Sequence, residues 1–477
     1  MNRHWNAGAR GLSRRQYLQR SGAGFGALAL AGLLGEEARA AGKSGADTSS
    51  AMAPRPPHFA PKAKRVLFLF MHGGPSQVDT FDYKPRLQAE SGNPLPFPKP
   101  RVVSSATGNL LGSPFPFQQH GQSGRWVSSL FPEVAKHVDD LCFLYSMYGS
   151  NSRHGAALLE LHTGSDTFVR PSMGSWITYG LGTENQNLPG FITICPTLTH
   201  GGVNNWASAF LPAVYQGTPI GNAGTASDQA QIPFIQNTET PRDIQRQELD
   251  FLGALNRERM GRTGPDTALE ARIESFELAF RMQSTVPGLQ DISDETPATR
   301  RLYGLEESKT RNFGRQCLMA RRFLERGVRF VQVTHSYKWD QHDQLRSGHT
   351  SNAAEVDLPI SGLLTDLKAR GLLEDTLVLW GGEFGRTPCA QGGDGRDHNP
   401  HGFTMWLTGA GVKPGFGYGA TDEFGYYSTE HRVHFHDLHA TLLHLLGLDH
   451  KRLTYRYVGR DFRLTDVHGE IVTPILA

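Results

Sequence analysis

Short apolar runs of strand length alternate with helical segments along most of this chain, and this alternation constrains the fold more than any other feature. Five such runs stand out, at residues 65–71, 141–147, 191–194, 328–333 and 376–380. Apolar residues at helical spacing lie between or after them, at 156–161, 313–327, 358–370 and 438–446. Strands that alternate with helices are typical of an α/β fold with a mostly parallel sheet. Asp437 is the expected N-cap of the last helix, and Gly447 is expected to end it.

The charge balance argues against a nucleic-acid partner. The chain has 48 lysines and arginines against 46 aspartates and glutamates, a formal net charge of +2. Residues 1–40 alone contain six arginines and two glutamates, so the rest of the chain is close to neutral. A nearly neutral body excludes a nucleic-acid binder held by bulk charge. With 38% hydrophobic and 20% charged residues, the composition also excludes a disordered chain.

The first 40 residues have the pattern of an export signal. Residues 13–18 read SRRQYL, a twin-arginine motif, and a weakly apolar stretch follows at 22–34. Ala38-Arg39-Ala40 is a small-x-small cleavage site, so we expect a twin-arginine signal peptide over 1–40 and a flexible leader over 41–62. The alternative is a membrane anchor, but the apolar stretch is shorter than the roughly 18–20 residues that a span needs. The expected location is periplasmic or secreted, with no stable membrane span after signal cleavage.

Residues 240–309 differ from the segments on either side. They are rich in arginine and glutamate and have helical periodicity, for example at 244–257 and 269–282. We interpret them as a helical insertion within one α/β domain over 63–465, which a C-terminal tail follows at 466–477. Their charge pattern fits a lid over the site and a surface for a partner equally well.

Histidine is concentrated in one quarter of the chain. Eleven of the 20 histidines lie between His335 and His450, several of them just beyond expected strand ends. Asp340 and His342 stand two residues apart in a loop after the strand that ends near residue 333. A carboxylate and a neutral imidazole so placed suit zinc, or manganese and iron in mixed nitrogen and oxygen sites. The alternative is a solvated polar loop.

Two further segments in this region carry candidate residues. Glu383 lies between glycines at the tip of an apolar strand, and Arg386 follows it, where its planar fork could grip an anionic oxygen. The alternative for this couple is a structural ion pair. His398 and His401 stand three residues apart in a polar loop and are either metal ligands or surface histidines.

The earlier part of the chain adds two weaker candidates. His72 ends the first strand and precedes a glycine turn that could approach an anion, or that is only a tight turn. Ser152, Arg153 and His154 precede a helix, where a hydroxyl could attack an anionic ester because the helix dipole and the guanidinium stabilise negative charge. The alternative is an ordinary helix N-cap.

Together these segments resemble a known bacterial family. The matching segments read MHGGPS at 71–76, LHTG at 161–164, WDQH at 339–342, GEFGRTP at 382–388, DHN at 397–399 and GAGV at 409–412. They resemble domain-of-unknown-function family 1501 (DUF1501) over about residues 63–465. That family is similar to the alkaline phosphatase and sulfatase superfamily, so the resemblance implies a three-layer α/β/α sandwich with a mostly parallel central sheet and a helical insertion.

The resemblance also implies a function, a metal-dependent hydrolase of phosphate or sulfate esters acting on a small-molecule or glycan ester. It implies a divalent metal, zinc first and calcium or manganese otherwise. Ser152 or a water molecule would be the nucleophile, beside His154, and Arg386 or Arg153 would stabilise the transferring group. The implied ligands are His72, Asp340, His342, Glu383, His398 and His401.

Two departures from the superfamily pattern keep other functions open. His72 stands where an aspartate is usual, and Phe384 stands where a histidine or asparagine is usual. The alternative is a non-catalytic relative that binds an anionic glycan or a protein partner. A third is a metal-dependent mutase or transferase on the same scaffold.

Overall fold

The computed structural model describes residues 51–98, 107–233, 235–264 and 266–477. The expected signal peptide over 1–40 and the first part of the expected leader, 41–50, lie outside the described residues. Among the helices in the described ranges, none combines the length and the apolar character needed to cross a bilayer.

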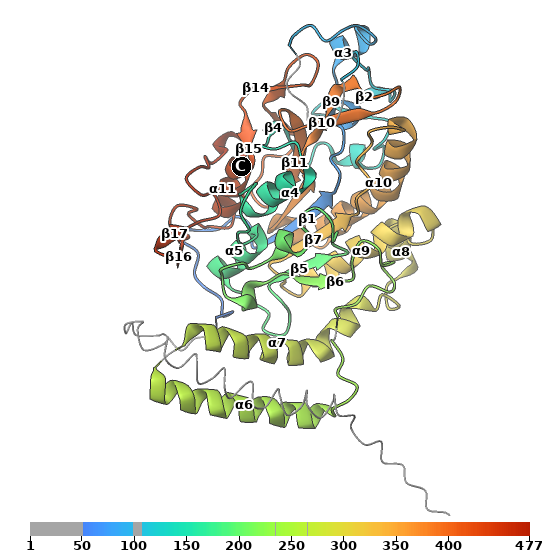
Figure 1. The fold of residues 1–477 in the computed structure, drawn as a ribbon. Helices are drawn as coiled ribbons and strands as arrows, with labels where there is room; N and C mark the ends of the chain where they lie inside the picture. Colours follow the sequence, from blue (N-terminus) through green and yellow to red (C-terminus); the bar gives the residue numbers. More distant parts are fainter. Residues whose placement is uncertain (1–50, 99–106, 234, 265) are drawn as a thin grey trace, which may run out of the picture.

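A nine-stranded sheet forms the centre of the protein (Figure 1). The strands follow the order β12-β4-β11-β8-β1-β7-β5-β6, and β15 pairs with β4. Every pairing is parallel except those of β11, which runs antiparallel to β4 and β8. The bounds are β1 (Arg65–Met71), β4 (Leu141–Tyr148), β5 (Phe191–Ile194), β6 (Thr218–Ile220), β7 (Phe330–His335), β8 (Thr376–Gly381), β11 (Phe403–Thr408), β12 (Phe416–Tyr418) and β15 (Val433–His434).

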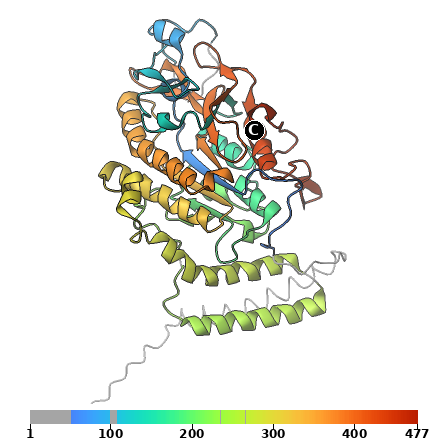
Figure 2. The same ribbon diagram turned by 180° about the vertical axis from the view of Figure 1, so that it is seen from behind.

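Helices cover both faces of this sheet. Leu67 and Leu69 of β1 belong to one apolar cluster with α9 (Ser308–Glu325) and α10 (Leu345–Ala369). Val66 and Phe68 alternate with them and belong to a second cluster, with the helices α4 (His154–Thr163), α5 (Met173–Leu181) and α11 (Phe435–Leu445). Since successive side chains of a strand point to opposite faces, the two clusters are the two sides of one three-layer α/β/α sandwich (Figures 1 and 2). The expected fold class is confirmed.

Smaller elements surround the sandwich. Four two-stranded sheets pair β2 with β3, β9 with β10, β13 with β14 and β16 with β17. Their bounds are β2 (Phe117–His120), β3 (Arg125–Ser128), β9 (Gly385–Ala390), β10 (Arg396–Asn399), β13 (Ala420–Thr421), β14 (Ser428–Glu430), β16 (Tyr455–Tyr457) and β17 (Arg460–Phe462), and two short helices are α2 (Gln77–Thr80) and α3 (Pro85–Ala89).

Several helices begin earlier than the sequence expectation, for example α9, which begins at Ser308 rather than 313. α10 begins at Leu345 rather than 358, because polar residues interrupt the apolar face of its first half; His349 Nε2, for example, is buried and accepts a hydrogen bond from the Ser76 N–H at 3.1 Å. The N-cap of α11 is His434, not Asp437. The Asp437 carboxylate instead accepts from the His434 N–H at 2.9 Å, as the third residue of a capping box. Gly447 follows α11 with a φ of 75°, as expected for a helix end.

The described part of the expected leader is packed, not free. Met52 is buried in the second apolar cluster, and the His58 N–H donates to the Gly447 carbonyl at 2.8 Å. Residues 51–62 therefore dock on the α5 and α11 side of the body. The tail over 466–477 is also docked, since Ile475 is buried and the Ala477 N–H donates to the Gly411 carbonyl at 2.8 Å.

The expected insertion contains α6 (Arg242–Thr263), α7 (Thr267–Gln290) and α8 (Pro297–Leu302). Glu274 of α7 accepts from the Ala51 N–H at 2.8 Å, and Arg281 Nε donates to the Gln186 carbonyl at 2.7 Å. Both partners precede strands, β1 and β5, so α7 lies at the amino ends of the strands. Figures 1 and 2 show the α6–α7 pair at the opposite end of the molecule from β9 and β10. In this arrangement the pair does not cover the carboxyl ends of the strands as a lid would.

Candidate metal centre

Three neighbouring strands end at one place and bring four of the expected residues together. His72 directly follows β1, Asp340 and His342 lie in the loop after β7, and Glu383 lies two residues beyond β8. The sheet order β8-β1-β7 makes these three strand ends adjacent. Ligands of open α/β sheets bind at the carboxyl ends of the strands, and this arrangement follows that rule.

Asp340 is the centre of the group. Its Oδ1 lies 3.0 Å from Nε2 of His342, 3.0 Å from Nε2 of His398 and 3.3 Å from Nε2 of His154. His398 comes from β10, and His154 is the first residue of α4. Three segments distant in sequence therefore bring three imidazoles to one carboxylate oxygen.

The far side of each of these rings faces an oxygen atom. Nδ1 of His398 lies 2.6 Å from the Ser152 carbonyl, Nδ1 of His342 lies 2.5 Å from Gln391 Oε1, and Nδ1 of His154 lies 2.6 Å from Glu383 Oε1. Carbonyl and ionised carboxylate oxygens only accept hydrogen bonds, so each Nδ1 carries the ring proton and donates it. In the neutral ring, each Nε2 then presents a lone pair toward Asp340.

These lone pairs fit a cation. Nε2 of His342 and Nε2 of His398 are only 2.9 Å apart, and both lie against the Asp340 oxygen. Lone pairs and a carboxylate so close repel one another unless a positive charge lies among them. Ligand atoms of His154, Asp340 and His398 lie within 4.8 Å of one another, and so do those of His342, Asp397 and His398. Imidazole nitrogens beside carboxylate oxygens, with each ring oriented by an oxygen behind it, match the donors and the supporting hydrogen bonds that divalent zinc takes in proteins.

The two carboxyl groups of the site are ionised at neutral pH. Burial opposes the charge of Asp340, but the neighbouring His154, His342 and His398 and the Arg386 guanidinium hold the pKa of its carboxyl far below the usual range. Burial likewise opposes the charge of Glu383, yet His154 and His72 lower its pKa to about 2. Burial lowers the pKa of His398, whereas the Asp340 carboxylate raises the pKa of His342, and Asp340 and Glu383 raise that of His154 against the effect of burial. At neutral pH the group thus combines two carboxylates with at least one neutral imidazole.

The sequence matches one protein family over most of its length. The family described as "Protein of unknown function (DUF1501)" matches residues 63–476. The chain belongs to the DUF1501 family. No curated protein matches it.

Several solved structures are similar to this DUF1501 protein at low identity. The lipoteichoic acid synthase LtaP from Listeria monocytogenes is 8% identical, with a TM-score of 0.37, over 87% of this chain and 78% of LtaP. A sulfatase from Pseudoalteromonas sp. is 12% identical, with a TM-score of 0.36, over 81% of this chain and 68% of the sulfatase. A protein in the alkaline phosphatase superfamily from Vibrio parahaemolyticus is 12% identical, with a TM-score of 0.34, over 87% and 74% of the two chains. Likeness at this level assigns no activity.

Glu383 and Arg386 of the DUF1501 chain lie behind the group. Glu383 is fully buried, and besides His154 its carboxylate accepts from the Gly73 N–H, at 3.0 and 3.2 Å from its two oxygens. Arg386 is also fully buried, and its Nη2 donates to Asp340 Oδ1 at 2.7 Å. Glu383 therefore orients His154, and Arg386 positions Asp340. Neither side chain is exposed where a substrate could reach it.

His72 belongs to an adjoining group that includes two residues missed in the sequence. Both ring nitrogens of His72 are buried and form no hydrogen bond with any described residue. Ligand atoms of His72, His154 and His200 lie within 4.8 Å of one another. The Tyr337 ring lies 4.7 Å from that of His72, and its hydroxyl donates to Asp340 Oδ2. His200 and Tyr337 follow β5 and β7, so the rule that places ligands at strand ends could have found both.

The remaining expected residues lie at or beyond the edge of the group. Ser152 contacts it through its carbonyl, and Arg153 is exposed as the residue before α4. His401 does not join the other candidate ligands, since its ring lies against Tyr427 at 5.5 Å. The group opens to solvent on the side of His342, whose side chain is 31% exposed.

Proposed function

We propose that this DUF1501 protein is an exported, metal-dependent hydrolase of phosphate or sulfate esters. The observation that carries the proposal is the convergence of three imidazole Nε2 atoms on the Asp340 carboxylate. His154, His342, His398 and Asp340 would hold the cation, with zinc as the proposed metal because of the nitrogen-rich donor set. A divalent cation in such a site supplies electrostatic polarisation of an ester oxygen.

The chain's own residues have distinct proposed tasks around that site. Glu383, Gln391 and the Ser152 carbonyl hold the three rings in the tautomer that keeps each Nε2 free. Arg386 positions Asp340 through the hydrogen bond that its Nη2 donates to Oδ1. Burial and the Asp340 carboxylate raise the pKa of Tyr337, so its hydroxyl keeps its proton at neutral pH beside the open side. Ser152 or a water molecule is the proposed nucleophile.

The periplasm or the cell exterior is the proposed location. Its support is the twin-arginine motif at 13–18, the apolar stretch at 22–34 and the cleavage site that ends at Ala40. The twin-arginine route carries folded proteins, so a metal could be loaded before export.

One observation favours a second function, binding of an anionic glycan or a protein partner without catalysis. No described residue forms a hydrogen bond with the Ser152 hydroxyl, and Arg153 is exposed. A nucleophilic serine ordinarily has a base within hydrogen-bond reach. The binding function does not require a metal, whereas the hydrolase does.

Elemental analysis of the folded protein, purified from the periplasm, tests the proposal. His342→Ala removes one proposed ligand from the exposed side, and His401→Ala is the matched control, a histidine of the same region outside the group. We expect near-stoichiometric zinc in the wild type and in His401→Ala, and a loss of at least tenfold in zinc affinity in His342→Ala. Phosphate and sulfate esters would then be screened for hydrolysis. Wild-type protein that takes up no metal from zinc, manganese or calcium would refute the hydrolase and favour the binding function.

A further inference from the structure

A pocket separate from the metal centre also lies near the carboxyl ends of the strands, but toward the β6 edge of the sheet. It has a volume of about 250 Å³ and lies between α8, the first turns of α9 and the loop after β6. α9 leads into β7 through a short turn and packs against that strand, so its first turns lie near the carboxyl ends of the strands. β6 is three strands from β1, which corresponds to about 15 Å across the sheet.

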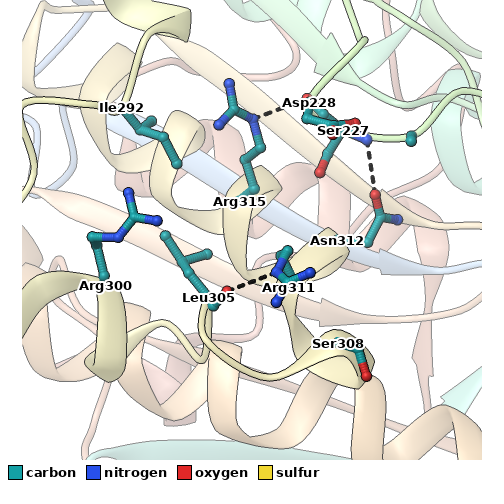
Figure 3. A pocket seen from close by; sticks show the side chains of 10 residues that line it. Ser227, Asp228, Ile292, Arg300, Leu305, Ser308, Arg311, Asn312 and Arg315 are labelled. Atoms are coloured by element: carbon teal, nitrogen blue, oxygen red, sulfur yellow. Dashed lines mark hydrogen bonds between the residues drawn. The ribbon is translucent and has the colours of Figure 1, made fainter. Parts of the chain in front are cut away.

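Three arginines line this pocket, Arg300, Arg311 and Arg315 (Figure 3). Within the described ranges, none of the three forms an ion pair with a carboxylate, and the Arg300 guanidinium has no hydrogen-bond partner. Figure 3 shows Leu305 between Arg300 and Arg311, with Arg315 beside them. The pocket therefore gathers three positive charges that no direct salt bridge neutralises.

Two of these arginines are held by neutral groups. Arg311 Nε donates to the Leu305 carbonyl at 2.9 Å, and its Nη2 donates to the Glu306 carbonyl at 3.2 Å. Arg315 Nε donates to the Ser227 carbonyl at 3.1 Å, and its Nη2 donates to the Gln290 carbonyl at 2.8 Å. Backbone carbonyls fix the orientation of a guanidinium without cancelling its charge, so Nη1 of each side chain stays available to a ligand.

The surroundings leave a net positive site. Asp228 lines the pocket and Asp291 lies near Arg315, but burial outweighs both carboxylates and lowers the pKa of the Arg315 guanidinium. Ser308 and Asn312 of α9 also line the pocket, and Asn312 Oδ1 accepts from the Ser227 N–H at 2.8 Å. Three guanidinium groups against these two carboxylates leave an excess of positive charge that an anion could neutralise.

We infer that this pocket binds a tetrahedral oxyanion, phosphate or sulfate, either free or as the charged group of a monoester. The planar forks of Arg300, Arg311 and Arg315 match the oxygens of such a group better than a point charge would. Ile292 and Leu305 supply an apolar wall that an organic monoester could contact and a free anion could not use. The site is independent of the metal centre and of the function proposed for it.

The test uses Arg300→Gln in the full-length protein. The Arg300 side chain forms no hydrogen bond with another described residue, so its replacement leaves the hydrogen bonds of Arg311 and Arg315 to backbone carbonyls intact. Arg301→Gln is the matched control, because Arg301 is the next residue of α8, is exposed and does not line the pocket. Both variants and the wild type are treated with a chelator, so that the metal centre is empty of metal. Inorganic phosphate, sulfate and glucose 6-phosphate are then titrated by calorimetry, at an ionic strength kept constant with chloride.

We expect one site for phosphate in the wild type, an affinity about tenfold weaker in Arg300→Gln, and a change of less than twofold in Arg301→Gln. Tighter binding of glucose 6-phosphate than of phosphate would identify a monoester as the ligand, and equal binding would identify the free anion. Unchanged phosphate affinity in Arg300→Gln would overturn the inference. So would an equal loss in both variants, which would show that net charge alone attracts the anion.

Discussion

Replacement of Arg386 by methionine separates a structural role of this side chain from a catalytic one. Its donors reach four backbone carbonyls, those of Gly73, Gly74, Trp339 and Arg396, besides Asp340. The Gly74 carbonyl lies 3.0 Å from Nε, the Trp339 carbonyl 3.1 Å from Nη2 and the Arg396 carbonyl 3.2 Å from Nη1. Methionine is shorter than arginine and has no donor, so it would leave these acceptors without the hydrogen bonds that Arg386 donates in the interior.

The expected cost follows from that count. Each buried acceptor that loses its donor costs about 1–3 kcal/mol, so the four carbonyls together cost about 4–12 kcal/mol. A typical domain has a free energy of unfolding of about 5–15 kcal/mol. Arg386→Met should therefore lose most or all of its stability. Arg386→Lys keeps a cation beside Asp340 and up to three donors, and we expect a smaller loss, about 2–6 kcal/mol.

Urea denaturation of chelator-treated protein, followed by tryptophan fluorescence, measures these changes. Trp339 is buried next to Arg386 and reports on the loop that carries Asp340. Arg153→Met is the control, the same chemical change at an exposed position, with an expected effect within about 0.5 kcal/mol. A free energy of unfolding of Arg386→Met within about 1 kcal/mol of the wild-type value, together with a loss of activity, would refute the structural role. Arg386 would then contact the substrate.

Two further perturbations test other parts of the structure. Burial lowers the pKa of His439 to about 3, and its Nε2 donates to the Leu161 carbonyl at 2.7 Å. Since the unfolded chain takes up this proton near pH 6.5, stability is lost as the pH falls below 6.5, by about 1.4 kcal/mol per pH unit. In His439→Gln the loss of unfolding free energy between pH 6.5 and 5 should be about 2 kcal/mol smaller, and an unchanged pH profile would contradict this. In Gly73→Ala the new Cβ would lie 2.7 Å from the Asp340 amide nitrogen at a φ of 116°, so zinc content should fall. Gly371→Ala is the control, with a φ of 69° and no atom within 4 Å, and it should keep its zinc.

Much of the architecture could be predicted from local pattern. The apolar runs at 65–71 and 191–194 became β1 and β5 with the same bounds, and 376–380 became β8 with one added residue. Such runs are visible because strands buried on both faces need apolar side chains at every position. The first half of α10 was missed for the opposite reason, since half of its buried residues are polar and are held by long-range contacts such as that of His349.

The sequence predicted which residues form the candidate site better than it predicted the role of each residue. Asp340, His342 and His398 were expected as ligands and do converge. Glu383 was also expected as a ligand and His154 as a catalytic residue. In the structure His154 faces Asp340, and Glu383 lies behind His154. Which residue of such a couple faces the centre depends on side-chain direction, and spacing along the chain carries no information on that.

The order of strands and helices, the strand ends that carry polar side chains and the near-neutral body are properties of the sequence alone. They depend on periodicity and composition over short stretches. The orientation of each ring and the burial of Arg386 come only from the tertiary structure. His154 and Glu383 are 229 residues apart, and Ser152 and His398 are 246 apart. A hydrogen bond between such distant residues forms only once the sheet has brought their segments together, and these bonds leave each Nε2 facing Asp340.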